Sequence, residues 1–153
     1  MRPRLAASLA LLGSLLTADR AAPPPIAQAR QVSAVVLDRN GDWLRAFTTP
    51  SGRWRLAADL DRTDPRLVEA LVALEDERFF LHPGVDPAAV VRAIAGRAAG
   101  TSQSGASTLT MQVARLMEPR PRTYGSKFIE MARALQLERR LAKREFLETW
   151  LTL

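Results

Sequence analysis

The chain has 153 residues, contains no cysteine, and carries 22 lysines and arginines against 16 aspartates and glutamates, a formal net charge of +6. The absence of cysteine excludes a disulfide framework and any thiolate metal site. The length suits one ordinary domain, and the positive charge predicts attraction to nucleic acid, a phosphorylated substrate or a membrane surface.

The first 31 residues have the pattern of an export segment followed by a linker. Arg2 and Arg4 precede an uncharged apolar run of 14 residues that ends at Ala18, an arrangement typical of export signals. The run is shorter than the ~20 residues that span a bilayer. A cleaved signal peptide and a retained membrane anchor are both open for residues 1–18. Residues 19–31 contain three consecutive prolines and predict an extended linker.

A β-hairpin is predicted over about residues 32–47, where Asn40-Gly41 separates two apolar runs. From about residue 64 the pattern becomes helical. Asp64 and Asp86 each precede a proline, which is the sequence of a helix cap followed by the first helical position.

Further helices are expected from Ser107 or Thr108 to Met117, from Ser126 to about Arg140, and from Lys143 onward. In the helix that follows Asp86, the spacing of the apolar residues predicts that the core-facing side chains are Val90, Val91 and Ile94. The chain beyond the hairpin is therefore expected to be almost entirely helical.

The segment from Glu75 to Asp86 concentrates acids and bases beside two phenylalanines. Glu75 lies at the expected end of an apolar helix, where partial burial makes a carboxylate a stronger base. Asp86 is explained most simply as a helix cap, and the single histidine, His82, is on its own more often structural than catalytic. Arg78 is either a solvated neighbour of Asp76 or, near a cleft, a phosphate ligand.

Two later segments are candidates for anion binding. Residues 105–112 begin with glycine and continue with hydroxyl side chains at a helix start, which favours either an anion site or a simple cap. Lys127 and Glu130 share one helix face, as a surface ion pair or as groups at the edge of the core. Together with Arg122, Lys127 has the charge to neutralise a pyrophosphate.

The three segments together supply two separated carboxylates, a hydroxyl-rich loop and several cations. This set suits attack by a hydroxyl at a sugar anomeric carbon, with one acid as the base and the cations stabilising a diphosphate leaving group. A lysozyme-like hydrolase also uses two carboxylates, but the cations favour a diphosphate donor. A nucleic-acid-binding domain explains the charge alone, because aromatic residues interleaved for base stacking are missing.

In order and spacing, these segments resemble the first three motifs of glycosyltransferase family 51, the peptidoglycan polymerase domain of class A penicillin-binding proteins, and most narrowly their 1C subgroup. The resemblance covers roughly residues 33–153. It implies a mainly α, lysozyme-like domain that polymerises lipid II by inverting transfer, at the outer, periplasmic face of the bacterial inner membrane. The implied partners are lipid II, the growing glycan strand, the membrane surface and other cell-wall synthesis proteins, and nucleic acid is not expected.

The resemblance also implies a role for each matching residue. Glu75 is the general base on the acceptor 4-hydroxyl, and Glu130 is the second acid, assisting the diphosphate or a divalent cation, Mg²⁺ or Mn²⁺. The residues implied in binding the substrate and its diphosphate are Arg78, Ser107, Thr108, Gln112, Arg122 and Lys127. The residues implied in support of the site are Asp76, His82 and Asp86.

The sequence departs from the usual family pattern in two places. Ala106 and Met111 replace the common glycine and glutamine of the second motif. The chain then ends inside what resembles the fourth motif, so an incomplete and inactive domain is expected, with exposed apolar side chains at Phe146, Leu147, Trp150 and Leu151. The alternative is a non-catalytic, membrane-associated remnant that binds lipid II or another wall component.

Overall fold

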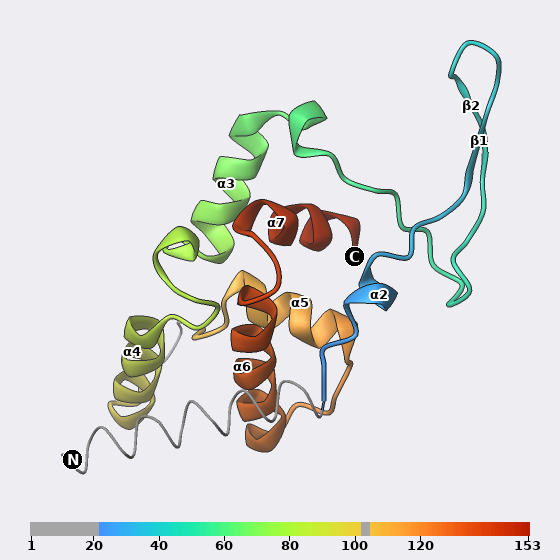
Figure 1. The fold of residues 1–153 in the computed structure, drawn as a ribbon. Coiled ribbons are helices and arrows are strands. Elements are labelled where there is room, and N and C mark those ends of the chain that lie inside the picture. Colours follow the sequence, from blue (N-terminus) through green and yellow to red (C-terminus); the bar gives the residue numbers. More distant parts are fainter. Residues whose placement is uncertain (1–21, 102–104) are drawn as a thin grey trace, which may run out of the picture.

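The computed structural model describes residues 22–101 and 105–153, and the expected signal or anchor of residues 1–18 lies outside these ranges. The described chain is mainly helical, as expected, with one antiparallel pair of strands (Figure 1). Its elements are α2 (Ile26–Ala29), β1 (Val35–Leu37), β2 (Trp43–Ala46), η1 (Leu60–Arg62), α3 (Pro65–Glu75), η2 (Phe79–Leu81), α4 (Pro87–Ala98), α5 (Leu109–Met117), α6 (Tyr124–Glu138) and α7 (Lys143–Thr152). Within those two ranges, no helix is both long enough and apolar enough to cross a membrane.

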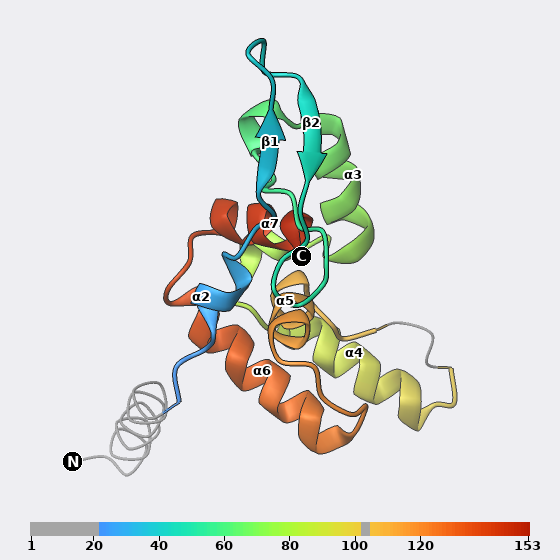
Figure 2. The same cartoon turned by 90° about the vertical axis from the view of Figure 1, so that its right-hand side faces the viewer.

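The predicted hairpin is present: it projects away from the helical body in Figure 1, and its two strands lie side by side in Figure 2. Its turn is organised by Asp38, whose Oδ1 accepts hydrogen bonds from the backbone N–H groups of Asn40 and Asp42 at 2.7 and 2.9 Å. Gly41 has a φ of +87°, which the turn requires and which glycine adopts without strain. The Asn-Gly signal was therefore read correctly, because the turn is determined by these local contacts.

The prediction of an extended linker over residues 19–31 is wrong for one helical turn. Residues 26–29 form α2, which contacts α5. Ala29 is 3% exposed, and Ile26 packs against the core. Burial of these two side chains stabilises the turn against the extended conformation that the neighbouring prolines favour.

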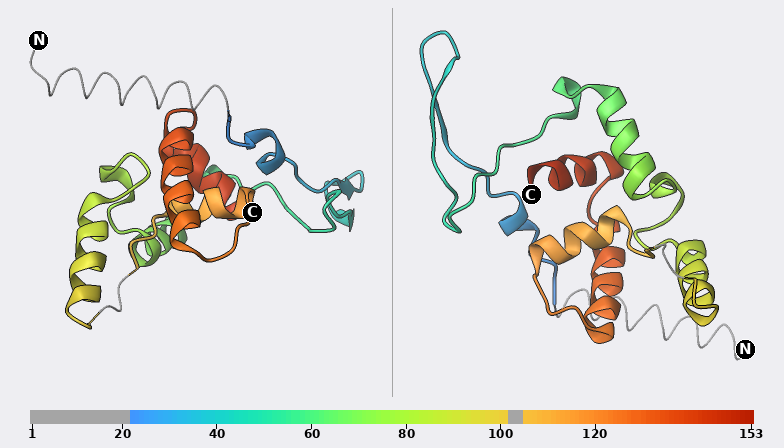
Figure 3. Two further views of the ribbon diagram at one scale, coloured as in Figure 1. Left: turned by 90° about the horizontal axis from the view of Figure 1, so that it is seen from below. Right: turned by 180° about the vertical axis from the view of Figure 1, so that it is seen from behind.

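The core is built around α5, which lies between α6 and α7 (Figure 3). Its buried face meets Leu137 of α6 and Phe146 and Leu147 of α7. The expectation that the α7 side chains are exposed is therefore wrong: Phe146 is 1% and Leu147 5% exposed, and Trp150 and Leu151 are half-buried. Contact with α5 provides the apolar cover that the sequence argument assumed to be missing.

Helix α4 begins as predicted, with Asp86 as its cap and Pro87 at the first helical position, and the Asp86 side chain accepts from the N–H of Ala88 at 2.9 Å. Of the three side chains predicted to face the core, Val90 is half-buried, and the prediction is wrong for the other two. Val91 and Ile94 are 64% and 65% exposed. The buried residue of α4 is the small Ala89. The helix packs through its Ala89 side and leaves Val91 and Ile94 uncovered.

Gly84, in the loop before α4, packs directly against α6, where an added Cβ would lie 2.8 Å from the Ala134 carbonyl oxygen and 2.8 Å from Glu138 Cγ. Its φ is +97°. We expect Gly84→Ala to lower the free energy of unfolding by about 2–3 kcal/mol, since left-handed strain and a backbone clash combine. Gly52→Ala is the control: its φ is +74° but nothing lies within 4 Å, and about 1 kcal/mol is expected. If urea unfolding showed the same loss of unfolding free energy for Gly84→Ala and Gly52→Ala, the close packing of Gly84 would be contradicted.

Candidate active site

The first motif and the start of the second line one pocket of about 370 Å³. It lies between the end of α3, the start of α4 and the segment before α5. Four acidic residues and two arginines line it, so acidic residues predominate. Its polar side chains belong to Glu75, Asp76, Glu77, Arg78, Asp86, Arg92, Ser107 and Thr108. Of the residues singled out from the sequence, six meet here.

Glu75 is the last residue of α3, and its side chain is exposed. The partial burial expected from the sequence is wrong, because the end of α3 lies at the rim of the pocket. Glu75 Oε2 accepts a hydrogen bond from Gln112 Nε2 at 2.8 Å, and Gln112 Oε1 accepts one from Trp150 Nε1 at 3.3 Å. Gln112, expected to bind the substrate or its diphosphate, contacts Glu75 in this structure.

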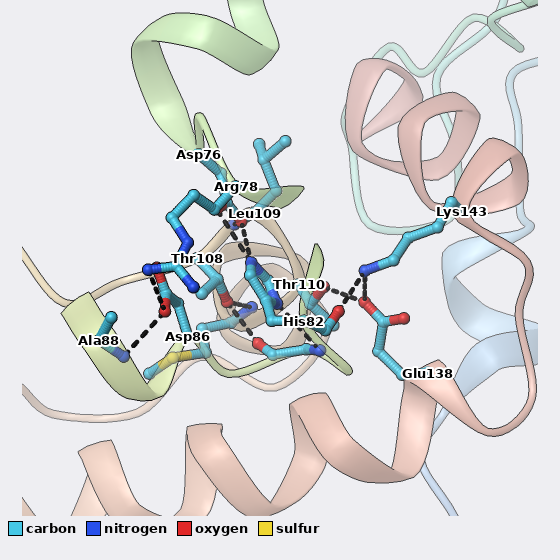
Figure 4. Close-up of polar contacts among 12 residues, drawn as sticks. Asp76, Arg78, His82, Asp86, Ala88, Thr108, Leu109, Thr110, Glu138 and Lys143 are labelled. Atoms are coloured by element: carbon cyan, nitrogen blue, oxygen red, sulfur yellow. Dashed lines mark hydrogen bonds and ion pairs between the residues drawn. The ribbon is translucent and has the colours of Figure 1, made fainter. Parts of the chain in front are cut away.

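Asp76 joins the first motif to α5 (Figure 4). Its buried carboxylate accepts from His82 Nε2 at 3.0 and 3.2 Å and from the backbone N–H of Leu109 at 2.9 Å. His82 Nδ1 accepts from the N–H of Gly84 at 3.2 Å, so the tautomer with the proton on Nε2 satisfies both contacts. Asp76, the residue next to Glu75, is thus fixed onto the N-terminus of a core helix, with His82 as its second partner.

Asp86 is both the cap of α4 and a wall of the acidic pocket. Burial works against its charged form, but hydrogen bonds from the backbone N–H groups of Ala89 and Ala88 and the nearby charge of Arg78 outweigh it, so the pKa of Asp86 lies below its usual value. Arg78 Nη1 lies 3.6 Å from Asp86 Oδ1. Arg78 is thereby held at the pocket, and its ion-pair partner is Asp86.

The third motif lines a second pocket, of about 470 Å³. Three cations face it, Arg115, Arg122 and Lys127, against the single carboxylate of Glu130. Glu130 is buried, and its Oε2 lies 3.2 Å from Lys127 Nζ. The lining is therefore predominantly positive, opposite in sign to that of the first pocket, which makes this pocket suited to an anionic group.

The two pockets adjoin at Ser107, which lines the acidic pocket and whose Oγ accepts a 2.5 Å hydrogen bond from Lys127 Nζ. Thr108 is engaged structurally: its hydroxyl donates to the Gly84 carbonyl at 2.5 Å and accepts from the N–H of Met111 at 3.2 Å. Both residues were predicted to belong to one anion-binding loop. In the structure Ser107 contacts the cation Lys127, whereas the hydroxyl of Thr108 contacts backbone groups.

Sequence reasoning missed Arg92 and Arg115, which line the two pockets. It also missed a half-buried ion pair between Glu138 and Lys143, whose Oε1 and Nζ are 2.7 Å apart. Lys143 Nζ also donates to the His82 carbonyl at 2.8 Å (Figure 4), so α7 is fastened to the first motif.

The donor set fits a protein-held divalent cation poorly. Glu130 is the single carboxylate of the positive pocket and already pairs with Lys127. In the described ranges there is no group of three or more His, Cys, Asp or Glu side chains arranged to hold a metal ion. A cation at Glu130 would need substrate phosphates as its other ligands, and no step below passes through one.

The sequence is similar to known proteins over most of its length. The sequence model of the family described as transglycosylase matches residues 40–153. The chain is 43% identical to penicillin-binding protein 1C of Escherichia coli K12 over 135 residues, 40% identical to penicillin-binding protein 1A of the same organism over 99 residues, and 36% identical to penicillin-binding protein 1A of Aquifex aeolicus over 109 residues. These matches cover 88%, 63% and 70% of this chain but 17%, 12% and 15% of the relatives. The chain therefore belongs to the transglycosylase family of the penicillin-binding proteins.

Proposed function

We propose that this site is a peptidoglycan glycosyltransferase site that polymerises lipid II into glycan strands, with undecaprenyl diphosphate as the leaving group. The observation that carries the proposal is the junction of an acidic and a positive pocket at the Ser107–Lys127 hydrogen bond. A hydroxyl that must lose a proton suits the first pocket, and a diphosphate suits the second. Family membership supports this assignment.

In the proposed reaction Glu75 accepts the proton of the acceptor 4-hydroxyl. The oxygen of that hydroxyl attacks the anomeric carbon of the donor sugar, and the bond from that carbon to the diphosphate oxygen breaks with its electron pair on the diphosphate. Attack opposite the leaving group inverts the configuration. Arg122 and Lys127 stabilise the charge that develops on the diphosphate, which needs electrostatic help more than protonation.

Glu130 acts through Lys127 in this account. Its buried carboxylate, 3.2 Å from Lys127 Nζ, directs the ammonium group toward the junction with Ser107. A divalent cation, Mg²⁺ or Mn²⁺, would have Glu130 as its single carboxylate ligand in this pocket and would supply further positive charge to the diphosphate. Since lipid II is held in a bilayer, the site is proposed to work at the outer, periplasmic face of the inner membrane with the growing glycan strand as its other substrate.

The chain's own activity can be tested directly. The exposed apolar side chains expected of an inactive domain are not found at Phe146 and Leu147, which are buried. Polymer formed from lipid II by the full chain supports the proposed function. Binding of lipid II without its consumption supports a non-catalytic binding role instead.

Lys127→Met is expected to lower kcat/KM for lipid II by about 100-fold, because one preorganised donor to the leaving group is lost. Arg53→Met is the control, since it removes the same charge from an exposed position near the hairpin. Consumption of lipid II is measured for both variants at one ionic strength. A Lys127 variant as active as the Arg53 variant would contradict a role for the positive pocket in binding the diphosphate.

A further inference from the structure

We propose that Trp150 is a positioning residue for Glu75. Its indole N–H fixes the amide orientation of Gln112, and Gln112 in turn fixes the carboxylate of Glu75. The catalytic part of this inference rests on the proposed function, because it requires Glu75 to act as the base. The contacts themselves do not depend on that function.

The three residues come from three helices and form a continuous chain of hydrogen bonds. Trp150 lies on α7, and its Nε1 donates to Gln112 Oε1 on α5 at 3.3 Å. Gln112 Nε2 donates to Glu75 Oε2, at the end of α3, at 2.8 Å. The three helices are thereby linked at the rim of the acidic pocket.

The chemistry of the three groups selects one arrangement. An indole N–H can only donate, and an ionised carboxylate can only accept. The amide of Gln112 offers one acceptor and one donating end, so it satisfies both neighbours in one orientation. In the flipped orientation its NH₂ group would face the indole N–H, and its carbonyl oxygen would face the carboxylate. Trp150 therefore determines which end of Gln112 is presented to Glu75.

In this series of three hydrogen-bonded residues, the Trp150 side chain is held more firmly than the Glu75 side chain. Trp150 packs against the core, beside the buried Phe146 and Leu147 on the same helix. The first residue of that helix, Lys143, donates to the His82 carbonyl at 2.8 Å. Glu75 has an exposed side chain with several rotatable bonds. A carboxylate of this kind samples many positions unless a neighbour holds it, and Gln112 is the neighbour that the structure provides.

The first test is kinetic. Trp150→Phe keeps an aromatic ring in place and removes the N–H. We expect kcat for lipid II to fall about tenfold, because a misplaced base reacts less often, while KM stays within about twofold. Trp54→Phe, at a position 72% exposed, is the matched control and should leave both constants unchanged. An unchanged kcat in a folded Trp150→Phe variant would overturn the positioning role.

The second test needs no activity. The chain contains three tryptophans, and in a Trp43→Phe, Trp54→Phe background the single indole N–H signal in a ¹H–¹⁵N spectrum belongs to Trp150. Gln112→Leu and Glu75→Ala are expected to move this signal, and Gln112→Leu to speed its exchange with water. Glu69→Gln, on an exposed turn of α3, is the control and should leave it in place.

The two tests separate the two claims. If the indole signal responds to Glu75 while the chain leaves lipid II unconverted, the contacts stand and the proposed function fails. If the chain polymerises lipid II but the signal ignores changes at Gln112 and Glu75, the proposed function stands and the positioning role of Trp150 is overturned.

Discussion

Glu75→Gln is expected to lower the rate of glycan formation from lipid II by about 1,000-fold, since a positioned general base contributes roughly 100- to 10,000-fold. The substitution preserves the shape of the side chain and a carbonyl oxygen that still accepts from Gln112, so the contact seen at 2.8 Å can persist. What is lost is the capacity to take a proton from the acceptor hydroxyl. The expected effect therefore falls on kcat, with the fold intact.

The measurement is the initial rate of lipid II consumption by the variant and the parent chain, with thermal unfolding followed for both. Glu69→Gln provides the control, because Glu69 is also an exposed carboxylate on α3 but does not line the acidic pocket. Polymer formed by the Glu75 variant at near the parental rate would exclude Glu75 as the base.

Asp76→Ala is expected to cost about 3–4 kcal/mol of unfolding free energy. It leaves two buried donors, His82 Nε2–H and the backbone N–H of Leu109, without the acceptor that each now contacts. Each unsatisfied buried donor costs about 1–3 kcal/mol. Asp76→Asn should cost less, about 2 kcal/mol, because one amide oxygen can still accept from one of the two donors.

The relative stability of Asp76→Asn and Asp76→Ala tests the role of the carboxylate more strictly than either free energy alone. In urea unfolding, the free energy of unfolding should be highest for the parent chain, lower for Asp76→Asn and lowest for Asp76→Ala. Glu77→Ala, which changes the next carboxylate along the chain at an exposed position, should fall within about 0.5 kcal/mol of the parent. If Asp76→Ala resembled Glu77→Ala, the carboxylate would not hold the first motif onto α5.

Local signals made much of the fold predictable from the sequence. Asp64 and Asp86 cap helices that begin at the following prolines, Thr108 caps α5, and Asn40-Gly41 forms the hairpin turn. Each of these features is decided by contacts within a few residues, which is why the residue pattern sufficed.

Features that depend on packing between distant segments were not predictable in the same way. Helical periodicity indicated an apolar face on α4 but not that Val91 and Ile94 would be left uncovered. It gave no sign that α5 covers Phe146. The chain end likewise suggested exposure where contact with α5 provides burial.

In the candidate site, too, the residues were largely predictable from the sequence, but their contacts were not. The motifs named most of the charged residues that gather in the two pockets, with the exceptions of Glu77, Arg92 and Arg115. They did not indicate the contacts that hold the site, because the partners of Gln112 and Asp76 lie on other helices. Hydrogen-bond networks of this kind are set by tertiary structure, and only coordinates reveal them.

The most direct test of the account is to give the full chain labelled lipid II and, in a parallel reaction, a neutral glycan strand. Lipid II is expected to be converted to longer glycan with release of undecaprenyl diphosphate, and the neutral strand is expected to stay intact. Cleavage of the neutral strand, or binding of lipid II with no conversion at any concentration of the chain, would contradict the account.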